Sequence, residues 1–292
     1  MRAFDRLNPF AVFAYFALTA GIAMFSMDPV ILGLSMIGAV LLFCIRCETK
    51  QLPTHAFSLF LFVTLTVINP LFQHNGVTVL FVLNDNPITL EALLYGGNAA
   101  AMIVSVLYWF RSFSNIISSD KLLYLFGSVS SKLALMISMS LRFVPLFRAQ
   151  ARKTDAAQRA MGEYRQDNII DTLRVKLSIF SILVSWALEN GIITADSMAA
   201  RGYGLKKRSY FSPYRFEKKD FFLLAAVLIL GGTVCVIMAM GELDFAFYPR
   251  ISALSLAGAR LYAYAAYGAL ALLPGAIEIG DSIKWQYLRS SM

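Results

Sequence analysis

The feature that most constrains this chain is a set of long apolar stretches, each close to the length that crosses a lipid bilayer. A hydrocarbon core about 30 Å thick requires about 20 helical residues. Of the 292 residues, 58% are apolar and only 15% are charged, which is too few polar residues for the surface of a soluble domain of this length. The sequence therefore predicts an all-α integral membrane protein with about six transmembrane helices. The expected spans are Phe10–Phe25, Val30–Ile45, Ala56–Phe72, Leu90–Phe110, Phe221–Met240 and Ile251–Leu273.

The lysine and arginine residues predict the orientation, because cytoplasmic loops hold an excess of them. With both termini in the cytoplasm, 24 of the 26 basic residues are cytoplasmic. They are Arg2, Arg6, Arg46 and Lys50, the 18 basic residues between Arg111 and Lys219, and Lys284 and Arg289. Arg250 falls on the outer side and Arg260 inside a span. We expect a multi-pass protein of the cell membrane with both termini cytoplasmic.

The segment between the fourth and fifth spans is strongly basic. It holds 18 basic and 9 acidic residues and accounts for the net charge of +8. The chain then divides into N-terminal transmembrane helices (1–110), cytoplasmic amphipathic helices (111–220), and C-terminal transmembrane helices with a short cytoplasmic tail (221–292). A basic surplus suits anionic lipid headgroups or an acidic protein partner. Nucleic acid fits least, since no aromatic residues interleave the basic runs.

Two or three amphipathic helices are expected in this basic segment, with breaks at Pro145 and Gly162 and a proline-free stretch from 169 to 201. Charged and small residues form separate stripes on them. The charged stripe is Arg148, Arg152, Asp155 and Arg159, and the small stripes are Ala149, Ala156 and Ala160, then Ala195, Ala199 and Gly202, followed by Lys206, Lys207 and Arg208. Taken singly, these are solvated faces or ordinary helix packing. Together they suit a surface that transmits force from a cytoplasmic partner.

The outer connection from 73 to 89 contains no basic residue. Two β-prone runs, Val77–Leu83 and the residues from Ile88 onward, flank the turn-forming sequence 84–87. We expect a hairpin or a re-entrant segment that packs against the spans.

The run from Ala195 to Gly204, with Ala200-Arg201-Gly202 at its centre, resembles the second coupling motif of a known family. This family is the transmembrane T component of energy-coupling factor (ECF) transporters, EcfT/CbiQ. Other matching runs occur in the family's order: Asn69-Pro70-Leu71-Phe72 with His74 and Gly76, Leu141-Arg142-Phe143-Val144-Pro145, and Lys207-Arg208-Ser209-Tyr210-Phe211 leading to Asp220.

The resemblance implies a non-catalytic subunit that links two cytoplasmic ABC ATPases to one small substrate-binding membrane subunit, the S subunit. ATP would be bound by the ATPases, so no cofactor is expected on this chain, and the cargo would be a vitamin or a transition-metal ion. In the family, an arginine in each of two motifs docks in an ATPase groove through carboxylates, a task suited to its planar, permanently charged fork. Ala200, Arg201 and Gly202 are therefore expected to contact one ATPase.

The first motif departs from the family pattern. In Ala157-Gln158-Arg159-Ala160-Met161-Gly162, methionine stands where the family has arginine. Arg159 lies two residues away, which turns it by about 200° around a helix. Either Met161 docks by apolar burial, or Arg159 reaches the ATPase by another route, or Met161 packs in a core and Arg159 is solvated. Arg159, Ala160, Met161 and Gly162 are the candidate residues.

Other chemistry is thin in this sequence. A Gly-x-x-x-x-Gly-Lys phosphate loop is absent, so ATP hydrolysis does not belong to this chain by that route. Cys44 and Cys47 have redox or metal spacing, but no second pair follows them. His55 and His74 lie far apart in the sequence. No metal site is predicted.

Two alternative functions stay open. A stand-alone secondary transporter or channel should show paired charges or interrupted repeats within its spans. A membrane enzyme should show clustered histidine, acidic or cysteine residues near an interface. The sequence shows neither pattern.

Overall fold

The structure, a computed structural model, divides into two compact units, Met1–Leu122 with Tyr214–Met292, and Leu123–Pro213. We call them the membrane unit and the α6–α7 unit. The described residues are 3–46, 52–73, 76–83, 86–162, 169–203, 214, 216–248, 251–252 and 258–290.

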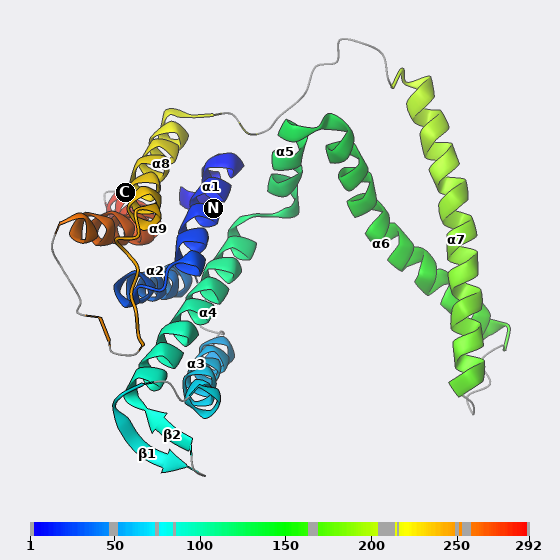
Figure 1. The fold of residues 1–292 in the computed structure, drawn as a ribbon. Helices are drawn as coiled ribbons and strands as arrows, with labels where there is room; N and C mark the ends of the chain where they lie inside the picture. The colour runs from blue at the N-terminus through cyan, green and yellow to red at the C-terminus, as the bar shows by residue number, and fades with distance from the viewer. Residues whose placement is uncertain are drawn as a thin grey trace. The chain divides into compact units, whose positions relative to one another are not determined.

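The membrane unit is a bundle of long helices (Figure 1). A short 3₁₀ helix, η1 (Ala3–Arg6), precedes α1 (Pro9–Phe25), α2 (Pro29–Arg46), α3 (Leu52–Phe72) and α4 (Leu90–Ile116), and the C-terminal part adds α8 (Lys218–Ala239) and α9 (Ala259–Ser290). Asn8 caps α1 by accepting the backbone N–H of Phe10, and Pro9 occupies its first turn. The backbone N–H of Asn8 also donates to Asp220 Oδ1 at 2.7 Å, which joins the starts of α1 and α8.

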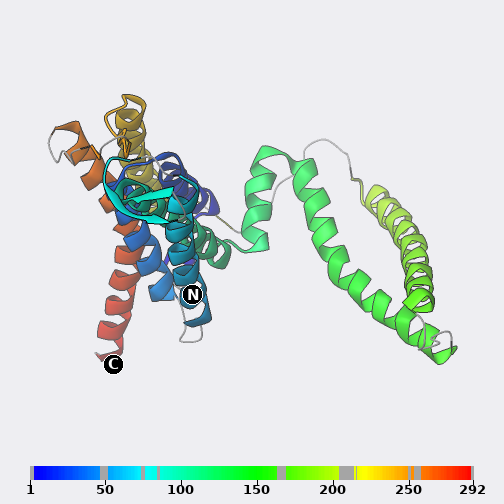
Figure 2. The same ribbon diagram turned by 60° about the horizontal axis from the view of Figure 1, so that its bottom comes forward.

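The α6–α7 unit consists of an antiparallel helix pair that follows α5 (Ser119–Val129). The chain runs along α6 (Ser131–Ala160), reverses, and returns along α7 (Ile169–Ala200), so the two helices converge toward the connection between them (Figure 2). Phe147 and Trp186 meet edge to face, with ring centroids 5.6 Å apart. Three helices in this region agree with the sequence prediction. Pro145 is not a break, however, since it lies inside α6, whereas Gly162 does end the helix.

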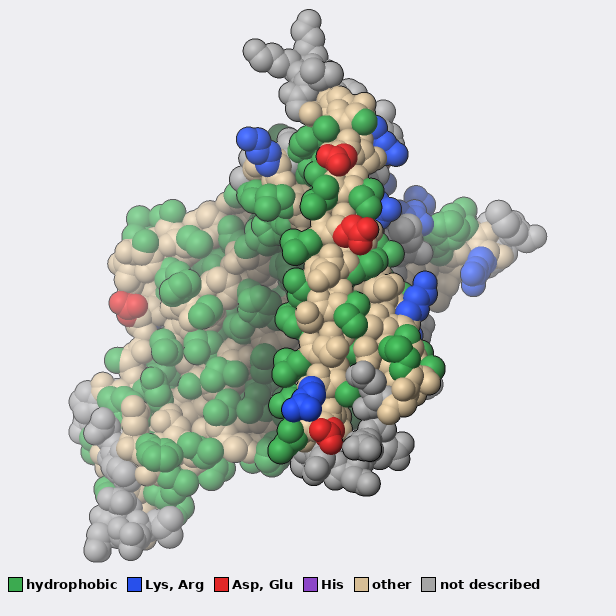
Figure 3. Space-filling model, turned by 90° about the vertical axis from the view of Figure 1, so that its right-hand side faces the viewer, with side chains coloured by type: hydrophobic (Ala, Val, Ile, Leu, Met, Phe, Trp, Pro, Cys, Tyr) green, Lys and Arg blue, Asp and Glu red, His purple; other side chains and the backbone are tan. Residues whose placement is uncertain are grey.

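Six described helices are long and apolar enough to cross a membrane, which confirms an all-α, multi-pass membrane protein. They are α2, α3, α4, α7, α8 and α9. Five of the predicted spans, those of α2, α3, α4, α8 and α9, are in this set; the helix of the first predicted span, α1, has 17 residues, and α7 is long and apolar enough as well. The high average charge of residues 111–220 hides the apolar character of α7, whose residues 177–188 carry no charge. Hydrophobic side chains run along the face of the molecule shown in Figure 3. The last span also begins later than predicted, at Ala259, and the expected tail is helical up to Ser290.

The core of the membrane unit combines aromatic packing with hydrogen bonds between helices. Tyr15 and Phe16 of α1 meet Trp109 of α4 edge to face, each with centroids 6.0 Å apart. The indole N–H of Trp109 donates to Ser35 Oγ in α2 at 3.0 Å, and the hydroxyl of Tyr15 donates to the carbonyl of Leu270 in α9 at 3.1 Å. Such bonds between helices hold a bundle together where surrounding lipid offers polar groups no partner.

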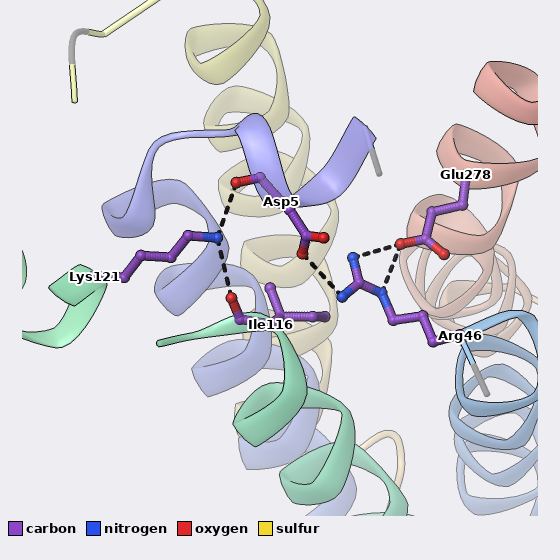
Figure 4. Close-up of polar contacts among 5 residues, drawn as sticks. All are labelled: Asp5, Arg46, Ile116, Lys121 and Glu278. Atoms are coloured by element: carbon purple, nitrogen blue, oxygen red, sulfur yellow. Dashed lines mark hydrogen bonds and ion pairs between the residues drawn. The ribbon is translucent and has the colours of Figure 1, made fainter. Parts of the chain in front are cut away.

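A buried ionic cluster joins five elements, η1, α2, α4, α5 and α9, at the end of the membrane unit that carries η1 (Figure 4). The guanidinium of Arg46 in α2 bonds Glu278 Oε1 in α9 at 2.6 Å and Asp5 Oδ1 in η1 at 3.0 Å. The ammonium of Lys121 in α5 donates to the carbonyls of Asp5 and Ile116 at 2.9 and 3.0 Å. The largest influence on the pKa of Lys121 is burial of its ammonium, which lowers this pKa below the ordinary lysine value. The cluster places η1, the end of α2 and the last turns of α9 at one end of the bundle.

The predicted hairpin between the third and fourth spans is present as β1 (Val79–Leu83) and β2 (Asn86–Thr89), which pair antiparallel. Its first strand does not pack as expected, since its side chains from Val79 to Val82 are exposed. Gly76 precedes the hairpin with φ +146°, and a Cβ there would lie 2.7 Å from Thr89 Oγ1 and from Glu91 Oε2. Only glycine fits this position.

Candidate docking site on the α6–α7 unit

The second motif forms the C-terminal end of α7. Gly202 takes a left-handed conformation with φ +72°. Its N–H bonds the carbonyl of Ala199 at 2.9 Å, and the N–H of Tyr203 bonds the carbonyl of Met198 at 2.9 Å. This pair of bonds is a Schellman cap, which requires glycine or asparagine at its left-handed position. The third residue of the Ala-Arg-Gly motif therefore ends the helix.

Arg201 is the last residue before this left-handed turn, and its side chain is exposed. Within the described parts of the chain it forms no ion pair. The neighbouring small residues Ala199 and Ala200 are exposed as well. A rigid helix end thus presents one guanidinium beside a surface that another protein can approach closely.

The first motif ends α6 in the same way. Gly162 has φ +76°, and its N–H bonds the carbonyl of Arg159 at 3.1 Å, which matches the bond from Gly202 to Ala199. Met161 therefore occupies the position in the cap that Arg201 occupies at the end of α7. Its side chain is 67% exposed, which excludes core packing within this unit.

Arg159 takes a different part in the first motif. Its Nε lies 3.0 Å from Asp155 Oδ2, one turn earlier on α6, and its side chain is also exposed. Arg159 and Met161 are two residues apart, which turns their side chains about 200° around the helix, so the motif presents them on separate faces of the helix end. The backbone geometry favours Met161 as the counterpart of Arg201.

The two motifs lie at opposite ends of α7. The first lies beside the connection that enters α7, and the second is at the far end of this helix. At 1.5 Å per residue, 32 residues make α7 about 48 Å long. One compact protein domain cannot readily contact both helix ends.

An apolar stripe along α7 escaped the sequence analysis. Its side chains recur every three or four residues, and each is between 41% and 70% exposed. They are Ile170, Leu173, Leu177, Phe180, Val184, Leu188 and Ile192. The spacing is present in the sequence as a helical apolar period, but the surrounding charge favours a cytoplasmic amphipathic helix. We call this set the α7 stripe.

The other candidates from the sequence do not assemble into a site. Cys44 on α2 and Cys235 on α8 are free and exposed, and Cys47 lies outside the described residues. The ring of His55 contacts the hydroxyl of Tyr108 at 2.9 Å, and His74 is likewise not described. Among the residues that the structure describes, no three metal-ligating side chains converge.

Comparison with known proteins identifies the family. A model of the CbiQ family, described as cobalt transport protein, matches residues 6–211. The chain belongs to the CbiQ family. The matched part runs from η1 through α7 and contains both candidate docking motifs.

Several curated relatives are ECF transporter transmembrane proteins, EcfT. That of Listeria innocua is 28% identical over 186 residues, 60% of this chain and 70% of the relative. EcfT 1 of Listeria monocytogenes is 30% identical over 107 residues, 36% and 40% of the two chains. The Streptococcus thermophilus protein is 31% identical over 113 residues, 38% and 43%. The matched part thus spans less than half of the last two relatives. This CbiQ-family chain is therefore similar to transmembrane proteins of ECF transporters.

Proposed function

We propose that this protein couples ATP hydrolysis by two cytoplasmic ABC ATPases to movement of a small substrate-binding membrane subunit, and has no catalytic activity itself. Import of a vitamin or a transition-metal ion is the function that this architecture would serve. The main observation behind this proposal is that α6 and α7 end in matching glycine caps, with Met161 exposed at the end of α6 and Arg201 exposed at the end of α7. ATP binding would close the ATPases, carry the two helix ends with them, and so move α6 and α7.

The α7 stripe supports an interaction with the third proposed partner, the substrate-binding membrane subunit. A continuous apolar stripe on a helix needs either lipid or an apolar protein surface against it. A small membrane protein offers such a surface, and the rest of α7 carries too few charges to keep the helix in water. We assign the stripe to the substrate-binding subunit.

The proposed orientation places both termini in the cytoplasm of a cell-membrane protein. The cluster of Asp5, Arg46 and Glu278 supports it, because it brings the N-terminal segment and the last turns of α9 to the same end of the bundle. Most basic residues lie between Arg111 and Lys219, the segment that joins α4 to α8, and the positive-inside rule places such a segment in the cytoplasm.

The test of the docking role is reversal of one charge. Arg201→Glu should weaken association with the ATPases on the order of 30-fold and abolish most uptake, because it opposes the carboxylates expected in the ATPase groove. The control is Arg174→Glu, which reverses an exposed arginine near the other end of α7. Binding is measured with purified ATPases, and membrane insertion by fractionation. Wild-type association and uptake with Arg201→Glu would overturn the proposal.

The first motif is tested by separate alanine variants. Met161→Ala should weaken ATPase association, because it removes the exposed apolar side chain at the helix end. Arg159→Ala should have less effect, since this arginine is paired with Asp155 on its own helix. If both variants bind like the wild type, the first docking contact lies elsewhere.

A further inference from the structure

A groove of about 1090 Å³ opens between α8, α9 and the N-terminal segment of the membrane unit. It runs from the start of α8 and the last turns of α9 toward the middle of both helices. Its outer end is polar and its inner part is apolar, and it lies outside the α6–α7 unit. Neither docking motif contributes to it.

The outer end of the groove carries an excess of positive charge. Lys218 and Lys219 begin α8, Lys284 lies near the end of α9, and Arg6 belongs to η1. All four side chains are exposed. In the described residues, none of the three lysines forms an ion pair.

Most of the nearby acidic groups are already engaged. Asp220 Oδ1 accepts the N–H of Asn8 at 2.7 Å, and its Oδ2 accepts the N–H of Glu217 at 2.9 Å. The carboxylate of Glu217 completes the capping box of α8 by accepting a backbone N–H. Asp281 is the remaining acidic residue at the groove. The four cations outnumber the three acidic residues of the groove, and two of these acids are held at the start of α8 by backbone N–H groups.

The length of the groove matches one leaflet of a bilayer. From Lys218 to Leu230 the groove follows α8 for about 18 Å, and from Lys284 to Ala269 it follows α9 for about 22 Å, at 1.5 Å per residue. Half of a hydrocarbon core is about 15 Å, with the headgroup region above it. The exposed Trp285 beside Lys284 is the residue type that lies at this interface.

The inner part of the groove is lined by apolar side chains, among them Phe222 on α8 and Leu272 and Ala276 on α9. All three are exposed in the chain alone. We propose that the groove binds one anionic phospholipid of the adjacent leaflet, with its phosphate against Lys218, Lys219 and Lys284 and an acyl chain along these apolar residues. A cationic rim over an apolar channel of this depth matches such a lipid in both charge and length.

The test uses the full-length protein in mild detergent, titrated with phosphatidylglycerol or with phosphatidylcholine. Bound lipid is counted by native mass spectrometry, and thermal unfolding is followed in parallel. Phosphatidylglycerol should bind in a one-to-one ratio and raise the unfolding temperature, and phosphatidylcholine should bind at least about tenfold more weakly. Equal binding of the two lipids would overturn the proposal.

Two sets of variants separate the headgroup from the chain. The triple variant Lys218→Ala, Lys219→Ala and Lys284→Ala should lose at least about tenfold in phosphatidylglycerol affinity. Its control removes the same charge from exposed lysines of the α6–α7 unit, as Lys132→Ala, Lys153→Ala and Lys176→Ala. Equal affinity of the two triple variants would contradict a site at the rim.

Ala276→Trp should fill the apolar channel and block the lipid, whereas Ala265→Trp, on α9 outside the groove, should not. Both alanines are exposed, so neither change disturbs the core. Binding that survives Ala276→Trp, or full competition by water-soluble glycerophosphoglycerol, would show an anion site without a seated lipid and overturn the proposal.

Discussion

Gly38 lies at a close contact between α2 and α9. A Cβ added to it would lie 2.8 Å from Ala271 Cβ and 2.9 Å from the carbonyl oxygen of Ala271. Because one of these atoms is backbone, the helices themselves would have to separate. Gly33 on the same helix has no neighbour within 4 Å of such a Cβ. The two glycines belong to one helix and differ only in what faces them.

This contrast gives a prediction at the scale of one residue. Gly38→Ala should lower the free energy of unfolding by about 1–3 kcal/mol, the usual cost of overpacking a close contact. Gly33→Ala should be neutral or stabilising by about 0.5–1 kcal/mol, since it only removes the entropic cost of a helical glycine. Unfolding of the purified protein in increasing SDS measures both. Equal stability of the two variants would show that α2 and α9 are not in contact here.

The candidate docking residues illustrate how far single positions can be predicted. The sequence anticipated that Gly162 breaks a helix, because glycine favours the left-handed conformation of a helix cap, but it placed Gly202 in the small stripe of a helix and not at its end. It left the choice between Arg159 and Met161 open. That choice depends on the cap geometry and on the pairing of Arg159 with Asp155, both of which require coordinates.

Among the elements, α7 departs most from expectation. A segment average of charge suggested a solvated amphipathic helix, but the charges lie on α6, toward the ends of α7 and in the flanking connections. What remains is a helix long and apolar enough to cross a membrane, with only 6% of its apolar window buried in the chain. Its exposed stripe therefore needs an apolar surface from outside the α6–α7 unit.

The corresponding prediction concerns the substrate-binding subunit. Replacing Leu177 and Phe180 with serine should weaken association with that subunit on the order of tenfold, because two apolar side chains would no longer be buried in the contact. Replacing Ile182 and Ile193, which are exposed on α7 outside the stripe, with serine is the control. Co-purification from mild detergent measures association. A larger loss with the control pair would place the partner on another face.

At the scale of the whole molecule, the separation of the two motifs is the decisive feature. The α6–α7 unit holds them at opposite ends of a helix about 48 Å long. The membrane unit is braced separately by the ionic cluster and by hydrogen bonds between helices. This division suits a rigid anchor and a lever that two partners move together.

The separation predicts that each motif contacts its own ATPase. A photo-crosslinking residue at Met161 or at Arg201 should attach one ATPase, and a chain carrying both should yield a species with two. Lys176, exposed near the start of α7, is the control position and should attach none. Crosslinked species are resolved by denaturing electrophoresis and mass spectrometry. A doubly substituted chain that never attaches more than one ATPase would contradict two separate contacts.

The sequence by itself determined that this chain is a helical membrane protein. A helix that crosses a hydrocarbon core needs a long run of consecutive apolar residues, and such runs can be recognised without coordinates. It also marked the helix break at Gly162, since caps are local. Only the tertiary structure decided that Arg46 meets Asp5 and Glu278, that Gly38 is the close contact, and that a lipid-sized groove lies between α8 and α9. These features join residues that are distant in the chain, so they depend on how helices pack and not on any local pattern.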